Sequence, residues 1–529
     1  MTKNADNTNQ NGDESQEEGL FRVASRYTEY SMANGEAEIE AENETRRRLR
    51  SLSKSEGVED SKLPMAPPPP PPRYGFFAKE NKLTRLQFFK EFPTIILVMC
   101  TFIFAVFSIY WGSMYGRENR YTNLKILVVG EDMVDGQYPL LSQALIQTGE
   151  TSPLNRLLGW EYHNRSEILE WANRDGKSSV EEECIWQVHK QDYWGTIYLP
   201  NGSETNELQQ IFANANTQIP IARNLVRGYY ESGRDFVSMG STVTPSLLRF
   251  DSAFTGIAGA DVYPQLINNL TDSQKDNLIQ NGATILSDLP MIALTDGRPV
   301  TDPVVLAPSQ VGLIYIVILT FFQFMWFIHL HGEMGKKLTT VNYIVYRIVV
   351  SQIAFLFLSL AYSCVSAAFQ VTFSNTWKGG FGVQWMFTFL TMSAVGGANE
   401  NVALLAFPVL PPLMGFWLLF WVIINIAPTF SPIALCPKFF RYGYAMPIHN
   451  SYEATKVLLF DTYRGQLGRN IGILIAYIVI NIAIAPLCIM FASYKFRQQA
   501  MAQAKARLEN EAKIRAEYSE SSDSSESKV

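Results

Sequence analysis

The sequence predicts a polytopic α-helical membrane protein with about six transmembrane helices and a large α/β exoplasmic domain between helices one and two. Three observations lead to this fold class. The 529-residue chain is 47% hydrophobic and contains several long stretches with almost no charge. A long polar segment separates the first stretch from the others and alternates strand-like with helix-like patterns. Acceptor motifs for N-linked sugar lie in this same segment.

The apolar stretches are the strongest signal, because about 20 apolar residues in a helix cross the hydrocarbon core of a bilayer. The six predicted spans are Pro93–Trp111, Val311–Leu330, Tyr343–Phe369, Gly382–Val395, Val402–Ile426 and Ile471–Ala492. Glycine and threonine shorten the apolar run of the fourth. The spans divide the chain into a disordered cytoplasmic arm with a polyproline spacer (1–92), helix one (93–111), the exoplasmic domain (112–310), helices two to six (311–492) and a cytoplasmic helix with an acidic serine-rich tail (493–529).

Basic flanks set the expected orientation, since lysine and arginine near a span stay in the cytoplasm. Five basic residues precede the first span within about 20 positions, whereas Arg117 and Arg120 follow it. The N-terminus is therefore expected inside, and with six spans the C-terminus as well. We expect an integral protein of the plasma membrane, with the secretory pathway and the vacuolar membrane as alternatives.

The predicted exoplasmic domain has an α/β pattern. Leu124–Gly130, Glu183–Lys190 and Trp194–Pro200 are predicted strands, and Ser203–Phe212 is a serine-capped helix. The three glutamates at 181–183 are expected in a solvated loop.

In the strand at 194–200, alternation predicts Trp194, Thr196 and Tyr198 on one face and Gly195, Ile197 and Leu199 on the other. Apolar groups on both faces indicate a central strand, so Trp194 is predicted to be a core residue and not a ligand platform.

The sequence contains four acceptor motifs for N-linked sugar. The motif at Asn43 lies in the predicted cytoplasmic arm and is interpreted as a chance match, whereas the other three begin at Asn164, Asn201 and Asn269. All three lie in the segment predicted to be exoplasmic. We therefore expect glycosylation at one or more of them.

Several stretches resemble a known family. The segments "KILVVGEDMVDGQYPL", "QDYWGTIYLPNGSETNEL" and "RGYYESGRDF", followed by the hydrophobic C-terminal half, are similar to the fungal nitrosoguanidine-resistance membrane proteins. That family carries a domain of unknown function and is similar in layout to type-two ABC exporter permeases and phage-infection-protein-like membrane proteins. The resemblance implies resistance to toxic small molecules, with some members described as export permeases. It supplies no defined substrate-binding residues.

Polar residues inside the spans are candidates for a transport path. Gln323 and Gln352 either line such a path or form hydrogen bonds between helices. Arg347 either reaches the cytoplasmic surface or has a buried role. No Asp or Glu is predicted inside the membrane, which argues against proton-coupled transport.

The fifth predicted span contains the sequence "FPVLPPLMGFW", in which Pro411 and Pro412 predict a kinked or broken helix. A moving break would mark a substrate path, and a fixed kink would be structural. The preceding "TMSAVGGANEN" (Thr391–Asn401) is predicted to be a short cytoplasmic turn. Pro437–Asp461 is predicted to contain a re-entrant or interfacial helix.

No sequence pattern indicates catalysis, a cofactor or a metal site. A nucleotide-driven pump needs a glycine-rich phosphate loop, and "HGEMGKKLTT" lacks its spacing. We therefore expect a protein that is not an enzyme and has no nucleic-acid partner. Its expected partners are membrane lipid, a small amphiphilic toxicant, and either a partner transporter or a second copy of the chain. Two functions stay open: a permease, or a non-transporting partner that affects lipid asymmetry or another transporter.

Overall fold

A computed structural model describes residues 76–133, 138–200, 205–218, 221 and 225–526. The polar arm predicted before residue 76 lies outside these residues. The described chain falls into two compact units, of which the larger covers residues 94–495. The smaller contains residues 76–93 and 496–526. In it, the Arg85 guanidinium donates to the backbone oxygens of Phe76 and Ala78 at 2.6 and 2.7 Å.

A mixed five-stranded sheet forms the centre of the α/β domain, in the order β2-β1-β3-β4-β5. β1 pairs in parallel with β2 and β3, β3 is antiparallel to β4, and β4 is parallel to β5. The strands are β1 (Lys125–Gly130), β2 (Gly159–Asn164), β3 (Gly195–Leu199), β4 (Val226–Tyr230) and β5 (Ile292–Asp296). The predicted strands at 124–130 and 194–200 are therefore confirmed.

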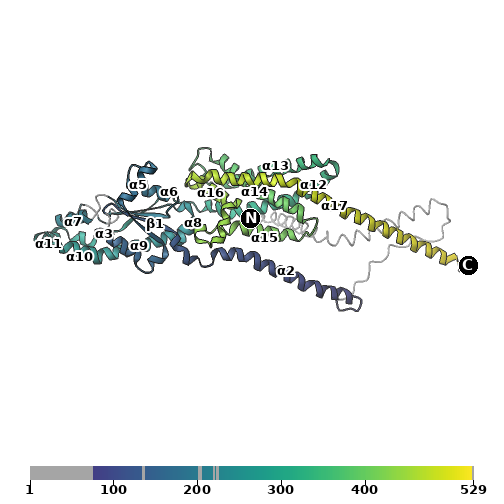
Figure 1. The fold of residues 1–529 in the computed structure, drawn as a ribbon, viewed down its shortest axis with the longest axis horizontal. Coiled ribbons are helices and arrows are strands. Elements are labelled where there is room, and N and C mark those ends of the chain that lie inside the picture. The colour runs from purple at the N-terminus through teal and green to yellow at the C-terminus, as the bar shows by residue number, and fades with distance from the viewer. Residues whose placement is uncertain (1–75, 134–137, 201–204, 219–220, 222–224, 527–529) are drawn as a thin grey trace, which may run out of the picture. The chain divides into compact units, whose positions relative to one another are not determined.

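Helices cover both faces of the sheet, with α5 and α6 on one side and α3 and α9 on the other (Figure 1). The helices of the domain are α3 (Leu140–Glu150), α4 (Leu154–Leu157), α5 (Arg165–Asp175), α6 (Val180–His189), α7 (Thr205–Asn214), α8 (Phe236–Ser238), α9 (Thr244–Ile257), α10 (Tyr263–Asn268) and α11 (Asp272–Asn281). Side chains alternate along β1: Ile126 and Val128 pack on the α3 side, and Leu127 and Val129 on the α6 side.

The central position predicted for the strand at 194–200 is confirmed, since every residue of β3 is buried. Trp194 is a core residue with 6% exposure. The face predicted for Trp194 is wrong, however. Trp194 packs in the cluster that contains Ile197, whereas Tyr198 lies in the opposite cluster, because the strand begins only at Gly195.

The predicted strand at 183–190 is wrong, because these residues belong to helix α6. The Ser179 side chain caps this helix by accepting a hydrogen bond from the Glu182 backbone N–H at 3.1 Å. The glutamates at 181–183 form its first turn, and Glu183 is buried. They are not a solvated loop. Negative charge at this position also favours the helix, because the N-terminal end of a helix dipole is positive.

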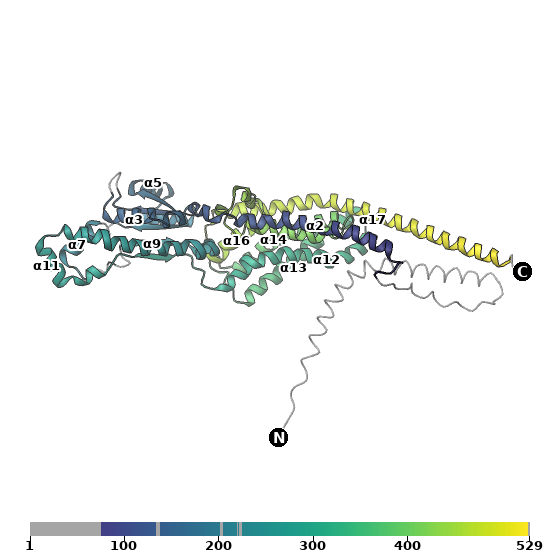
Figure 2. The same ribbon diagram turned by 90° about the horizontal axis from the view of Figure 1, so that it is seen from below.

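The hydrophobic half of the chain is a helical bundle in which α12, α13, α14 and α17 run alongside one another (Figures 1 and 2). The helices outside the α/β domain are α2 (Lys82–Met114), α12 (Gly312–Lys337), α13 (Thr340–Ala368), α14 (Gly380–Ala406), α15 (Leu413–Ile426), α16 (Pro447–Phe460) and α17 (Leu467–Glu526). Four regions are helical, long and apolar enough to cross a membrane: 85–114, 303–337, 340–368 and 464–510. These contain the first, second and sixth predicted spans, and the third except for Phe369.

The fourth and fifth predicted spans have the wrong boundaries. Residues 391–401 are not a turn, since they lie inside α14, which packs against α12, α13 and α16. Two glycines permit this packing: a Cβ at Gly396 would lie 2.4 Å from the Phe355 ring, and one at Gly397 would lie 2.9 Å from Asn481. The chain turns after Ala406, and α15 is a separate, shorter apolar helix.

Helix α16 lies within the predicted interfacial segment and joins the bundle to the α/β domain. Nearly all of its residues are buried. Asn375, in the connection between α13 and α14, donates to the Leu459 backbone oxygen, and Thr376 donates to the Val457 oxygen. The last turn of α16 is thereby tied to the end of the bundle that carries the α/β domain. At the opposite end, α12 is joined to α13 and α14 to α15.

Candidate functional site

An acidic side chain that the sequence predicts in a cytoplasmic turn lies inside the helical bundle. The Glu400 carboxylate of α14 lies 3.9 Å from the Arg347 guanidinium of α13, measured from Oε2 to Nη2. Ser351, one turn along α13, donates its hydroxyl to both carboxylate oxygens at 2.6 and 2.8 Å. Arg347 is only 4% exposed. The two opposite charges are therefore held between two buried helix faces.

The surroundings of this pair contain polar atoms that have no hydrogen-bond partner among the described residues. Gln323 of α12 lies beside the Glu400 carboxylate, but neither atom of its amide makes a hydrogen bond of ordinary geometry. Both ring nitrogens of His331 lack partners, as do Nε and Nη2 of Arg347 and the Tyr346 hydroxyl. We call these groups the bundle cluster, which consists of Gln323, His331, Tyr346, Arg347, Ser351 and Glu400.

Two hollows border the bundle cluster. A small cavity of about 30 Å³ lies between α13, α14 and α17, and its polar lining residues are Ser351, Gln352, Ser393, Glu400, Asn401 and Asn481. A larger groove of about 540 Å³ lies between α12 and α13 and is apolar except for Gln323. Gln323 and Glu400 therefore place polar groups beside an apolar groove and a polar cavity.

Two other polar residues of α14, Asn399 and Asn401, form hydrogen bonds to neighbouring helices. Asn399 donates to the Val317 backbone oxygen and the Thr320 hydroxyl at 3.2 and 3.1 Å, and it accepts from the Trp417 indole at 2.9 Å. Asn401 donates to the Asn481 backbone oxygen at 3.0 Å. These side chains join helices by hydrogen bonds, which distinguishes them from the bundle cluster.

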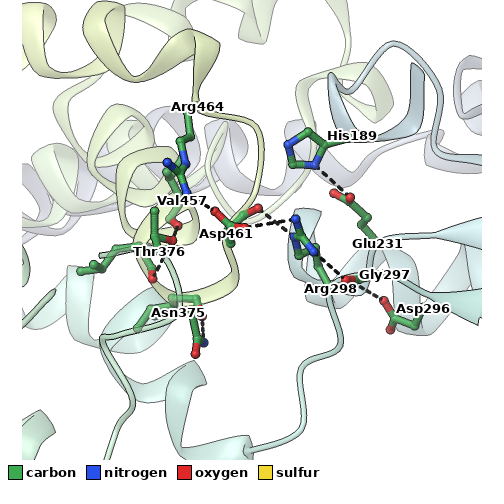
Figure 3. Close-up of polar contacts among 12 residues, drawn as sticks. His189, Glu231, Asp296, Gly297, Arg298, Asn375, Thr376, Val457, Asp461 and Arg464 are labelled. Atoms are coloured by element: carbon green, nitrogen blue, oxygen red, sulfur yellow. Dashed lines mark hydrogen bonds and ion pairs between the residues drawn. The ribbon is translucent and has the colours of Figure 1, made fainter. Parts of the chain in front are cut away.

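A second group of charged side chains, some of them partly exposed, joins the α/β domain to α16 (Figure 3). Asp461 follows α16 in a left-handed conformation and forms ion pairs with Arg298 at 3.1 Å and Arg464 at 2.7 Å. Arg298 also donates to the Asp461 backbone oxygen at 3.0 Å. Nearby, a His189 ring nitrogen lies 3.0 Å from the Glu231 carboxylate.

Lysine 456 makes a second connection between α16 and the domain. Lys456 Nζ donates to the Arg234 backbone oxygen at 2.7 Å and to Glu453 at 2.8 Å. Desolvation lowers the pKa of Arg234 to about 10. Burial raises the pKa of Asp235, and the positive charge of Lys456 partly offsets this. We call this group the domain junction, which consists of Arg234, Asp235, Arg298, Glu453, Lys456 and Asp461.

The Arg234 guanidinium also makes hydrogen bonds and a ring contact within the α/β domain. It donates to the backbone oxygens of Tyr193 and Gln191 at 2.5 and 2.7 Å. Its Cζ lies 3.9 Å from the centroid of the Trp194 ring. This close stacking of a cation on an aromatic ring favours the observed packing of Trp194.

The residues predicted to line a transport path lie in different parts of the structure. Gln323 and Arg347 belong to the bundle cluster, and Gln352 lines the small cavity. Pro411 and Pro412 lie in the turn between α14 and α15, at the end of the bundle away from the α/β domain. The helix break predicted within 402–426 is therefore present, but it separates two helices, and whether this segment moves stays a prediction.

Glu400 is the functional candidate that the sequence prediction missed. The sequence contained a usable signal, because Glu400 is the only charged residue in the 27-residue helix α14. The paired glycines of "TMSAVGGANEN" favour a turn at the level of sequence, and a turn would place Glu400 outside the membrane. Glycines in membrane helices also permit close helix packing, as Gly396 and Gly397 do here.

The predicted glycosylation sites differ in their surroundings. Asn269 is exposed and follows α10. Asn164 caps α5, and its Oδ1 accepts hydrogen bonds from the Glu167 backbone N–H and the Ser166 hydroxyl. Asn201 lies outside the described residues. Modification at these positions stays a prediction.

The apolar helices, together with the α/β domain, define a polytopic membrane protein. The chain belongs to a family described as a protein of unknown function (DUF3533), which matches residues 95–483. It is 33% identical over 441 residues to an uncharacterized endoplasmic reticulum membrane protein of Saccharomyces cerevisiae, covering 81% of this chain and 85% of that protein. No solved structure matches the chain.

Proposed function

We propose that the protein is a permease-like membrane protein that gives resistance to toxic small molecules, such as nitrosoguanidine, by exporting amphiphilic compounds. One observation carries this proposal: the Arg347–Glu400 pair lies buried in the helical bundle among polar atoms without partners in the described chain. Ionisable residues inside membrane helices are costly and usually mark a path for an ion or a substrate.

The environment of the pair also suits an amphiphile. The groove between α12 and α13 offers an apolar surface of the kind that an aliphatic or aromatic group contacts. Gln323 lines this groove and lies beside Glu400, so the apolar and charged regions adjoin. A molecule with an apolar part and a hydrogen-bonding group would contact both.

Localisation forms part of the proposal. The name of the yeast relative places that protein in the endoplasmic reticulum membrane. We propose that this chain resides in membranes of the secretory pathway, with the plasma membrane as its predicted destination, and that both termini are cytoplasmic. The α/β domain would then be exoplasmic.

Complementation of a resistance defect tests the function. Cells lacking the endogenous relative would express the wild-type chain, Glu400→Gln or Glu333→Gln, and growth on nitrosoguanidine would be divided by protein abundance. Glu333 is the matched control, because it pairs with Lys336 on the exposed end of α12. We expect Glu400→Gln to lose resistance and Glu333→Gln to retain it. Full resistance per molecule in Glu400→Gln would contradict the proposal.

A second candidate is a non-transporting partner that affects lipid asymmetry or another transporter. The groove between α12 and α13 favours it, because exposed side chains such as Trp326 and Phe357 surround a concave apolar surface on the outside of the bundle. Purified wild-type protein in liposomes would distinguish the two functions. Uptake or release of labelled toxicant without any added protein supports the permease, and its absence supports the partner.

A further inference from the structure

We propose that Glu400 binds and releases a proton at the small cavity between α13, α14 and α17, and that this protonation is coupled to transport. The coupling to transport rests on the proposed function, whereas proton binding by Glu400 does not. The cavity of about 30 Å³ is lined by the carboxylate itself and by five other polar side chains. A polar cavity of this size can hold one or two water molecules.

The surroundings of the Glu400 side chain can stabilise both its charged and its protonated form. Ser351 donates to both of its oxygens, and a hydroxyl can equally accept a hydrogen bond from a protonated acid. Arg347 lies at 3.9 Å, which is an ion-pair distance without a direct hydrogen bond. The pair is therefore close enough to stabilise the charged form and loose enough to separate.

The charges around Glu400 are few among the described residues. α13 supplies Arg347 as the positive charge, and α12 supplies the neutral Gln323 and, next to Arg347, the titratable His331. α17 faces the cavity with Asn481 and apolar side chains. The charge of the site is thus set by one acid, Glu400, and one permanent positive charge, Arg347.

This balance suggests how proton binding and substrate binding are coupled. A proton delivered by water in the cavity forms an O–H bond with one carboxylate oxygen, and Glu400 becomes neutral. The Arg347 guanidinium then loses its counter-charge, and its Nε and Nη2 atoms can donate to an acceptor group on a substrate. Release of the proton restores the ion pair and weakens the hold on the substrate. By reciprocal coupling, a bound substrate that carries an acceptor group in turn favours the protonated form of Glu400, so proton and substrate are bound together and released together.

Labelling with dicyclohexylcarbodiimide tests proton binding directly. A protonated carboxyl in an apolar site transfers its proton to a carbodiimide nitrogen while its oxygen bonds to the central carbon. The acyl group then migrates from that oxygen to a nitrogen and leaves a stable N-acylurea. The full-length wild-type protein in liposomes would be labelled over a range of pH, and the Glu400 peptide would be quantified by mass spectrometry. We expect labelling at acidic pH that falls as the pH rises. Absence of the adduct at every pH, or labelling independent of pH, would overturn the inference.

Variants sharpen this experiment. Arg347→Gln removes the charge that opposes protonation, so labelling of Glu400 should persist to higher pH, and Glu333→Gln should leave the profile unchanged. An unchanged profile in folded Arg347→Gln would contradict the role of Arg347. Resistance by the wild-type chain with Glu400 unlabelled would overturn the proton inference alone. Labelled Glu400 in a chain that confers no resistance would contradict the proposed function alone.

Discussion

The domain junction and the bundle cluster both bury charged side chains, but they differ in how those charges are satisfied. At the domain junction, the Lys456 ammonium has two hydrogen-bond acceptors and Asp461 pairs with two arginines. In the bundle cluster, Arg347, Gln323 and His331 all have atoms without a partner among the residues that the structure describes.

This difference indicates which buried charges stabilise the fold. A buried polar group that finds its partners fixes one arrangement, whereas one without them is costly and calls for an explanation. The domain junction connects α16 to the α/β domain and has the contacts of a structural joint. The bundle cluster retains polar atoms that a proton, water or substrate can satisfy. We therefore assign a structural role to the domain junction and propose the functional role for the bundle cluster.

The largest effect is expected at the domain junction. Lys456→Met would remove both hydrogen bonds of the ammonium and leave Glu453 without its partner. Breaking a buried pair in this way costs about 3–5 kcal/mol. Thermal unfolding in detergent should show a large loss of stability and cells a large loss of protein, whereas Lys438→Met, at an exposed lysine, should change neither. Normal stability of Lys456→Met would show that the junction does not stabilise the fold.

A smaller effect is expected from helix packing beside the bundle cluster. In Gly396→Ala the new Cβ would lie 2.4 Å from the rigid, buried Phe355 ring. Overpacking of this kind costs about 1–3 kcal/mol. Gly382→Ala in the same helix is the matched control, because no atom lies within 4 Å of its added Cβ. Equal melting temperatures of the two variants would show that α14 is packed less closely than described.

The prolines should contribute little. Pro411 and Pro412 lie in a turn, and Pro412 caps α15 with an ordinary φ of -59°. Pro411→Ala with Pro412→Ala should therefore change stability by less than about 1 kcal/mol and leave resistance per molecule unchanged. Loss of resistance at normal abundance would instead restore the hypothesis that this segment moves during transport.

The smallest effect on stability is expected at Asn269, which is exposed. Asn269→Gln should remove one glycan without changing stability, detected as a mobility difference that endoglycosidase abolishes. Asn164→Gln should in addition lose the helix cap and cost about 1 kcal/mol. If the wild-type mobility is unaffected by endoglycosidase and by both substitutions, the exoplasmic position of the α/β domain is in doubt.

Much of the fold could be predicted from the sequence, and the errors have physical causes. Strands β1 and β3 are short β-branched or aromatic runs, which are distinctive when both faces are buried. The α6 sequence was mistaken for a strand because short apolar runs are ambiguous in period. Ser179 and Glu182 carried the missing signal, since a serine followed three residues later by glutamate marks a helix start.

The candidate site was harder to predict, because its members come from three helices. Gln323 and Arg347 were recognised as polar residues inside apolar spans. Glu400 was missed because α14 is rich in small and polar residues and does not have the hydropathy of a membrane span. α14 can be less apolar since it packs between other helices, and only tertiary structure shows this.

The most direct test of this account compares one arginine from each region. Arg347→Gln removes the partner of Glu400, which can take up a proton to become neutral, whereas Arg234→Gln removes hydrogen bonds that tie down the backbone at Tyr193 and Gln191. Abundance and nitrosoguanidine resistance would be measured for both variants in the same cells. The account predicts that Arg347→Gln keeps its abundance and loses resistance per molecule, while Arg234→Gln loses both in proportion. Full resistance in Arg347→Gln, or normal abundance with low resistance in Arg234→Gln, would contradict it.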